Sequence, residues 1–105
     1  MIKYIDKLYL TENTRKKLNK IKRDIRRKKF LSLVYIIILS ENEVDVFDII
    51  PIRMMKFRKK SDDEIVILGI AENKKAAIRL CSDMSLEYMD ARSELSMREY
   101  FKSLY

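Results

Sequence analysis

The chain has 105 residues with one cysteine and no histidine, and its net charge is +7. This length fits a single domain over residues 1–105, in the cytoplasmic setting expected of a lone cysteine. An internal disulfide is excluded, and without histidine the usual zinc sites and the usual general base are absent, so we expect no metal, no cofactor and no enzymatic activity.

The first segments of the chain show helical periodicity. Residues 2–9 carry apolar side chains at helical spacing and are predicted to form a helix. A second helix is predicted over residues 12–28, where Leu18, Ile21 and Ile25 share one side. The apolar sides of the two segments point in nearly opposite directions, so one straight helix cannot hold both. We expect the break in 11–14, where threonine and asparagine are good caps.

Three β-branched, aromatic segments predict strands at about residues 30–39, 44–50 and 64–71. Pro51 should end the second strand or mark it as an edge strand, because proline cannot donate to a central ladder. The first and third strands are apolar on both faces. This pattern indicates that helices cover both sides of the sheet, or that a partner chain does.

The rest of the chain predicts two more helices, at about residues 73–90 and 97–104. Cys81 lies on the apolar side of the first, which indicates core packing rather than catalysis. Ser96 and Glu99 form a capping box for the second. The predicted fold class is α+β, with a three-stranded antiparallel sheet, packed helices and the order α-α-β-β-β-α-α.

A cationic segment, Arg15–Lys29, is the strongest functional signal. Ten of its fifteen residues are lysine or arginine, and Asp24 is its only acid. Residues 1–30 carry a net charge of +9, whereas residues 61–105 carry −3. Like charges at i,i+4 destabilise a helix by a few tenths of a kcal/mol per pair, so this pattern favours a role in contacting an anionic surface.

The cations of this segment recur at i, i+4, i+7 and i+11, opposite the aliphatic side, over about 16 Å of helix. We expect them to contact the phosphates of nucleic acid; they are Lys16, Lys20, Arg23 and Arg27, with Arg26 on one flank. The alternatives are a solvated helix, pairing with the acidic half of the chain, or an acidic protein partner. Three aliphatic residues make too small an apolar side for a membrane partner.

A second cationic segment surrounds Met54, Met55 and Phe57. Its Lys56 and Arg58 could extend the contact surface, because cations beside an aromatic ring suit single-stranded nucleic acid. Alternatively, the apolar side chains belong to the core or to a subunit interface. The sequence therefore predicts a small non-enzymatic binding protein, with a protein-interaction or homo-oligomerisation module as the alternative. Its composition, rich in isoleucine and lysine, is typical of AT-rich bacterial or phage genes.

A third reading comes from the acidic residues. Asp45 or Asp48 on the second strand and Glu72-Asn73-Lys74 after the third make the chain resemble metal-dependent nucleases of the PD-(D/E)xK type. The resemblance implies that carboxylates hold Mg²⁺ while Lys74 orients water. In that family the Glu-x-Lys motif lies within the strand. An acid at a helix N-terminus, which the helix dipole favours, is the simpler explanation of Glu72.

Overall fold

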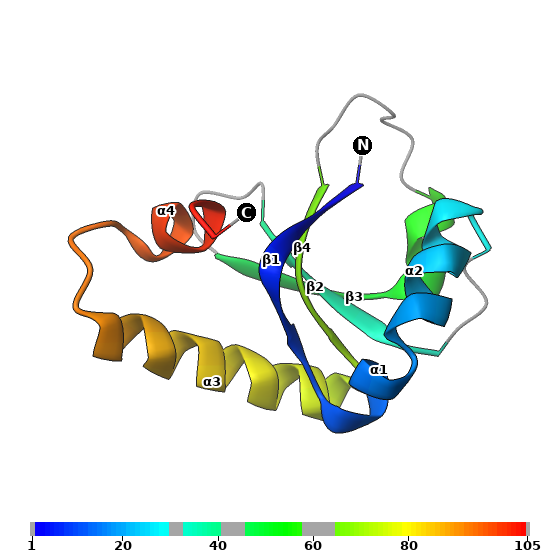
Figure 1. The fold of residues 1–105 in the computed structure, drawn as a ribbon, viewed down its shortest axis with the longest axis horizontal. Coiled ribbons are helices and arrows are strands. Elements are labelled where there is room, and N and C mark those ends of the chain that lie inside the picture. Colours follow the sequence, from blue (N-terminus) through cyan, green and yellow to red (C-terminus); the bar gives the residue numbers. More distant parts are fainter. Residues whose placement is uncertain (1, 30–32, 41–45, 58–64, 105) are drawn as a thin grey trace.

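A computed structural model describes residues 2–29, 33–40, 46–57 and 65–104 (Figure 1). One sheet lies between two groups of helices, which confirms the α+β class. In chain order the elements are β1 (Ile2–Leu10), α1 (Glu12–Lys16), α2 (Leu18–Arg26), β2 (Tyr35–Leu39), β3 (Phe47–Pro51), the 3₁₀ helix η1 (Ile52–Phe57), β4 (Ile65–Ala71), α3 (Lys74–Ala91) and α4 (Met97–Lys102).

The sheet is four-stranded and mixed, so the prediction of three antiparallel strands was wrong. Its strand order is β1-β4-β2-β3, with β1 parallel to β4 and β2 antiparallel to both β3 and β4. Strands β2 and β3 pair antiparallel, and β3 is an edge strand that ends at Pro51, as predicted.

The N-terminal segment, predicted as a helix, is strand β1, and this changes the element order. Its even-numbered apolar residues pack toward one face of the sheet, whereas Ile5 and Tyr9 pack toward the other. A strand that is apolar on both faces loses its simple alternation and can mimic helical spacing. The pairing with β4 also shifts register between Tyr4 and Tyr9, which disturbs the pattern further.

Two hydrophobic cores lie on opposite faces of the sheet, so the expectation that helices cover both sides was correct. On one face α3 and α4 pack over a core that includes Ile37, Leu68 and Met84. On the other face α2 and η1 pack over a core that includes Ile36, Ile67 and Ile21. Because both central strands are covered on both faces by the chain itself, they leave no apolar sheet face for a partner chain.

Gly69 permits this close packing at the centre of the sheet. A Cβ atom at this position would lie 2.8 Å from the backbone oxygen of Tyr9, and 3.3 Å from side-chain atoms of both Ile37 and Leu80. Any side chain there would push β1 or α3 away from β4. The glycine is thus required by the approach of neighbouring elements, not by an unusual backbone angle.

The helix boundaries follow from side-chain caps. Thr11 caps α1 through its hydroxyl, at the break expected in 11–14. The predicted helix 12–28 is divided at Lys17, where the backbone leaves helical geometry. Asn73 caps α3 by accepting a hydrogen bond from the Ala76 amide at 2.7 Å. The predicted cap at Ser96 is confirmed by its bond from the Glu99 amide.

Candidate functional site

The cationic helix is fixed to the sheet by its apolar side and by one buried hydroxyl. Ile21 and Ile25 of α2 are each 3 % exposed and pack into the core beneath. The buried Thr14 of α1 donates a hydrogen bond from Oγ1 to the Ile70 carbonyl of β4 at 2.9 Å. These contacts set which side of the helices faces solvent.

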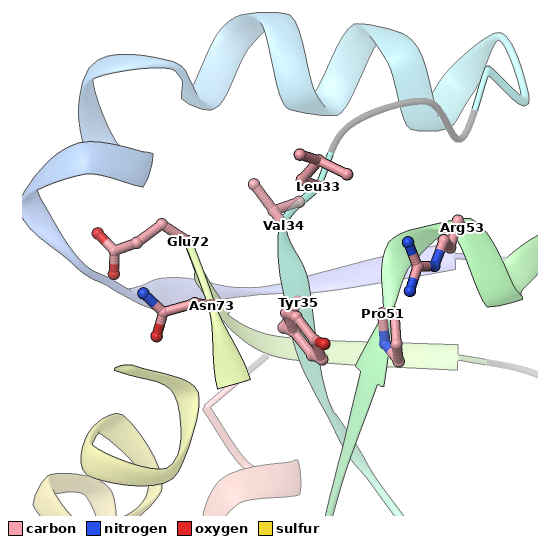
Figure 2. A pocket seen from close by; sticks show the side chains of 7 residues that line it. All are labelled: Leu33, Val34, Tyr35, Pro51, Arg53, Glu72 and Asn73. Carbon is pink, nitrogen blue, oxygen red and sulfur yellow. The ribbon is translucent and has the colours of Figure 1, made fainter. Parts of the chain in front are cut away.

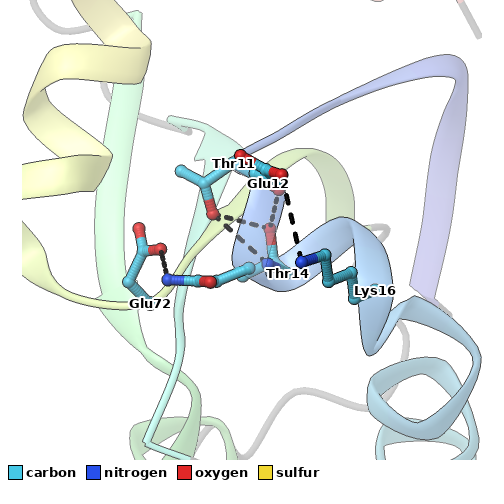
Figure 3. Close-up of polar contacts among 6 residues, drawn as sticks. Thr11, Glu12, Thr14, Lys16 and Glu72 are labelled. Atoms are coloured by element: carbon cyan, nitrogen blue, oxygen red, sulfur yellow. Dashed lines mark hydrogen bonds and ion pairs between the residues drawn. The ribbon is translucent and has the colours of Figure 1, made fainter.

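Four exposed cations, which we call the basic ridge, follow one another along α1 and α2: Lys16 ends α1, Lys20 and Arg23 lie in α2, and Arg27 is its C-cap. The break at Lys17 separates Lys16 from the other three, so the single continuous helix expected from the sequence is not present. Among the described residues one ion pair involves the ridge, from Lys16 Nζ to the Glu12 carboxylate at 3.9 Å (Figure 3). Both partners are exposed and lie one helical turn apart, so the pair is worth a few tenths of a kcal/mol. In the described part of the chain, the acidic C-terminal half forms no ion pair with the ridge.

Two other cations of α2 lean toward the edge strand β1. The Lys22 ammonium lies 4.7 Å from the centre of the Tyr4 ring. Burial raises the pKa of Tyr4, and the nearby positive charge of Arg26 partly opposes that rise. Arg26 is exposed, but it belongs to this flank rather than to the basic ridge. A polyanion bound along the ridge would meet Arg26 at its border.

The second cationic segment is divided between surface and core. Met55 in η1 is buried beneath α2, as the alternative interpretation of this segment predicted, whereas Arg53 and Met54 are exposed. The Lys56 backbone lies in η1, but its side chain is outside the described part of the structure. Arg58 is outside the described residues altogether, so a cationic surface formed with these two residues stays a prediction.

A cavity of about 200 Å³ lies where β2 begins and β3 ends (Figure 2). Its polar wall consists of Arg53, Glu72 and Asn73, and its other walls are apolar or aromatic. Two of these polar groups already have partners, because Glu72 accepts a hydrogen bond from Asn13 at 2.8 Å and Asn73 caps α3. The cavity is below the roughly 300–1,000 Å³ typical of small-molecule sites.

Of the acidic residues in the nuclease-like interpretation, Asp48 and Glu72 lie far apart. Asp48 pairs with Ile38, which in turn pairs with Ile67, so Asp48 lies level with Ile67 across the sheet. Glu72 follows five residues later, a displacement of about 16 Å along the strands. No group of three metal-ligating side chains occurs within residues 2–29, 33–40, 46–57 and 65–104. Asp45 lies outside these ranges.

Cys81 is a half-buried residue of α3 that packs against the core, as its position on the apolar side predicted. Burial raises the pKa of the Cys81 thiol to about 11. We therefore expect alkylation by iodoacetamide at pH 8 to be roughly tenfold slower in the folded protein than in denaturant, since the thiolate is the nucleophile. The rate should rise between pH 9 and 11, and mass spectrometry can follow it.

The raised pKa of Cys81 also makes the stability of the folded protein depend on pH. The unfolded chain loses the Cys81 proton at a lower pH than the folded protein, so the contribution of this thiol to stability is complete below about pH 9 and is lost as the pH rises to 11. Fast alkylation of the native protein at pH 7 would contradict the burial of this thiol.

Two residues that orient the site carried no signal in the sequence. Thr14 looked like part of a helix break, yet its hydroxyl joins α1 to β4 across 56 positions of the chain. The Asn13 side chain likewise donates a hydrogen bond to Glu72, which lies between β4 and α3 (Figure 3). Local spacing cannot indicate such contacts, because each depends on the placement of β4 beside β1.

Within the described part of the chain, no helix is both long enough and apolar enough to cross a membrane. No protein family, curated protein or solved structure matches this chain. A function must therefore be inferred from the basic ridge and its surroundings.

Proposed function

We propose that the protein binds nucleic acid by placing the basic ridge of α1 and α2 along a phosphate backbone. The observation that supports this proposal is the exposure of all four ridge cations, with Lys16–Glu12 as their one ion pair in the described part of the chain. Lys16, Lys20, Arg23 and Arg27 contact phosphates, and Arg26 contacts the border of the same backbone.

Helix stability explains part of this charge but not all of it. Cations in the last turn of a helix interact favourably with its dipole, which accounts for Arg23 and Arg26 near the end of α2. Lys20 lies near the beginning of α2, where the dipole disfavours a cation, and the first turn of α2 has no acid to compensate. Binding to an external anion would explain why a cation is placed at Lys20 although it destabilises the helix.

The length of the ridge sets the size of the contact. Lys20, Arg23 and Arg27 extend over about 10 Å of α2 and its C-terminal end, and Lys16 lies in α1 beyond the break at Lys17. Duplex DNA carries one charge per about 1.7 Å of its axis, so this length of α2 corresponds to about six phosphates, and with Lys16 the ridge would neutralise about four. A contact of this kind positions the protein without reading sequence, so we expect little discrimination between sequences.

The salt dependence of binding tests the proposal. With four phosphate contacts, the logarithm of the association constant for a duplex should fall with a slope of about −3.6 against the logarithm of salt concentration. Affinity should therefore drop roughly 150-fold between 50 and 200 mM salt, and the slope for a single strand should be near −2.8. Fluorescence anisotropy with a labelled duplex and a labelled single strand measures both.

A polyglutamate chain of matched length serves as the competing anion. The duplex should bind more tightly than polyglutamate at every salt concentration, because it carries one charge per about 1.7 Å whereas extended polyglutamate carries one per about 3.5 Å, so binding to the duplex releases more condensed counterions. Undetectable binding to nucleic acid at 50 mM salt rejects the proposal. Tighter binding to polyglutamate would instead identify the partner as an acidic protein.

A further inference from the structure

Helix α3 carries an apolar stripe on the side that faces away from the sheet. Among the described residues, six large apolar side chains are exposed, and three of them lie in α3: Ile78 is 53 % exposed, Leu86 57 % and Met89 66 %. Ala77, Leu80 and Met84 fill the core from the opposite side of the same helix. The helix is therefore apolar on two sides, and its own domain covers one of them.

Helical geometry places these three side chains close together around Ser82. At about 100° per residue, Ile78 and Leu86 lie some 40° to either side of Ser82, and Met89 lies about 20° from it. Lys75 falls within the same arc. The small serine at the centre leaves room for another helix to approach closely.

The charged residues beside the stripe are basic in the N-terminal half of α3 and acidic in its C-terminal half. The N-terminal half has Lys75 and Arg79, and the C-terminal half has Asp83 and Asp90, all four exposed. By the same geometry, Arg79, Asp83 and Asp90 lie on one flank, about 60–100° from Ser82. A second α3 in the antiparallel direction would present its acids to these bases, and its bases to these acids.

A two-fold axis at Ser82 puts these charges in register. With a rise of 1.5 Å per residue, Arg79 of one helix and Asp83 of the other differ by about 3 Å in position along the helix axis. Lys75 of one helix and Asp90 of the other differ by about 2 Å in the same direction. The symmetry repeats each pair, which gives four complementary pairs. Ile78 of one helix meets Met89 of the other on the opposite flank of the contact.

We propose that the protein forms a homodimer by antiparallel packing of α3 against α3 of a second copy. The apolar stripe supplies the contact area, and the four charge pairs fix direction and register. The interface thus lies on α3, not on the sheet faces or at Met55, since those are covered by the chain's own helices. Because α2 and α3 lie on opposite faces of the sheet (Figure 1), the dimer carries its two basic ridges on its two outer sides.

The first measurement is the mass of the full chain in solution. Light scattering coupled to size exclusion, together with sedimentation equilibrium up to hundreds of micromolar, should give twice the 12.6 kDa chain mass at the higher concentrations. Leu86→Asp should give a monomer whose circular dichroism spectrum is unchanged, because Leu86 is exposed in the single chain. A parent protein that stays monomeric at every concentration overturns the proposal.

A charge-swap experiment tests the register. Arg79→Glu and Asp83→Arg each place like charges opposite one another in the homodimer, so each variant alone should dissociate at least tenfold more readily than the parent. Mixing the two variants in equal amounts should restore dimerisation, because residue 79 of each chain then faces an opposite charge at residue 83 of the other.

The mixture separates this contact from effects within one helix. Residues 79 and 83 are also one turn apart in the same chain, and there the like charges of each variant remain in the mixture. Recovery in the mixture can therefore come only from contact between chains. Lys102→Glu, on the exposed side of α4, is the control and should leave the parent's dissociation constant unchanged. Failure of the mixture to recover rejects the antiparallel register.

Discussion

Replacing Phe101 by alanine should cost the protein about 3–5 kcal/mol of unfolding free energy. Phe101 is fully buried, although it belongs to the short helix α4 near the end of the chain. Its ring contacts aromatic rings from three other elements, Tyr9 of β1, Phe47 of β3 and Tyr88 of α3, and the ring of Tyr100 in α4 itself. The side chain therefore joins both edge strands to the helical layer, and its loss leaves a cavity that the rigid sheet cannot close.

Urea unfolding followed by far-ultraviolet circular dichroism measures this loss. Phe101→Leu keeps most of the volume and should cost clearly less than alanine. Lys102→Ala, at the exposed neighbouring position, should stay within about 0.5 kcal/mol of the parent. A loss of less than 1 kcal/mol for Phe101→Ala would show that α4 is not an integral part of the core that it covers together with α3.

The elements that the sequence predicts correctly are those whose pattern is complete within a short window. Helix α3 has a regular apolar side and a strong cap at Asn73, and β4 is a continuous apolar run. Strand β1 fails this test, because both its faces are apolar and its partner lies far away in sequence, with Ile2 beside Ile65. Insertion of β4 between β1 and β2 is a property of the whole chain, and no local spacing encodes it.

The same distinction holds for the candidate site. The spacing of apolar residues was sufficient to predict the buried side of α2, because Ile21 and Ile25 repeat at helical spacing within that one segment. The cations between them were therefore expected on the exposed side. The spacing could not predict that the flank carrying Lys22 and Arg26 would lie beside Tyr4, since Tyr4 was expected in a helix. Likewise, the separation of Asp48 from Glu72 depends on strand register, which required the fold.

Reversing the four ridge charges should remove most of the affinity for nucleic acid. We expect the variant with glutamate at positions 16, 20, 23 and 27 to bind a duplex on the order of 10²–10³ times more weakly than the parent at 50 mM salt, because each contact that releases a counterion becomes a repulsion. The slope of binding against salt should approach zero. Thermal unfolding should show an intact fold, as all four side chains are exposed.

A matched variant separates the ridge from net charge. Glutamate at four exposed cations elsewhere (Lys7, Lys74, Arg92 and Lys102) gives the same net charge of −1, eight units below the +7 of the parent. Two of these cations lie in or next to α3 and one in α4, on the far side of the sheet from the ridge. Long-range repulsion alone would weaken both variants equally, and that outcome would contradict a ridge-specific contact. If the ridge touches the phosphates, the matched variant should keep a salt slope near that of the parent, because its phosphate contacts are intact.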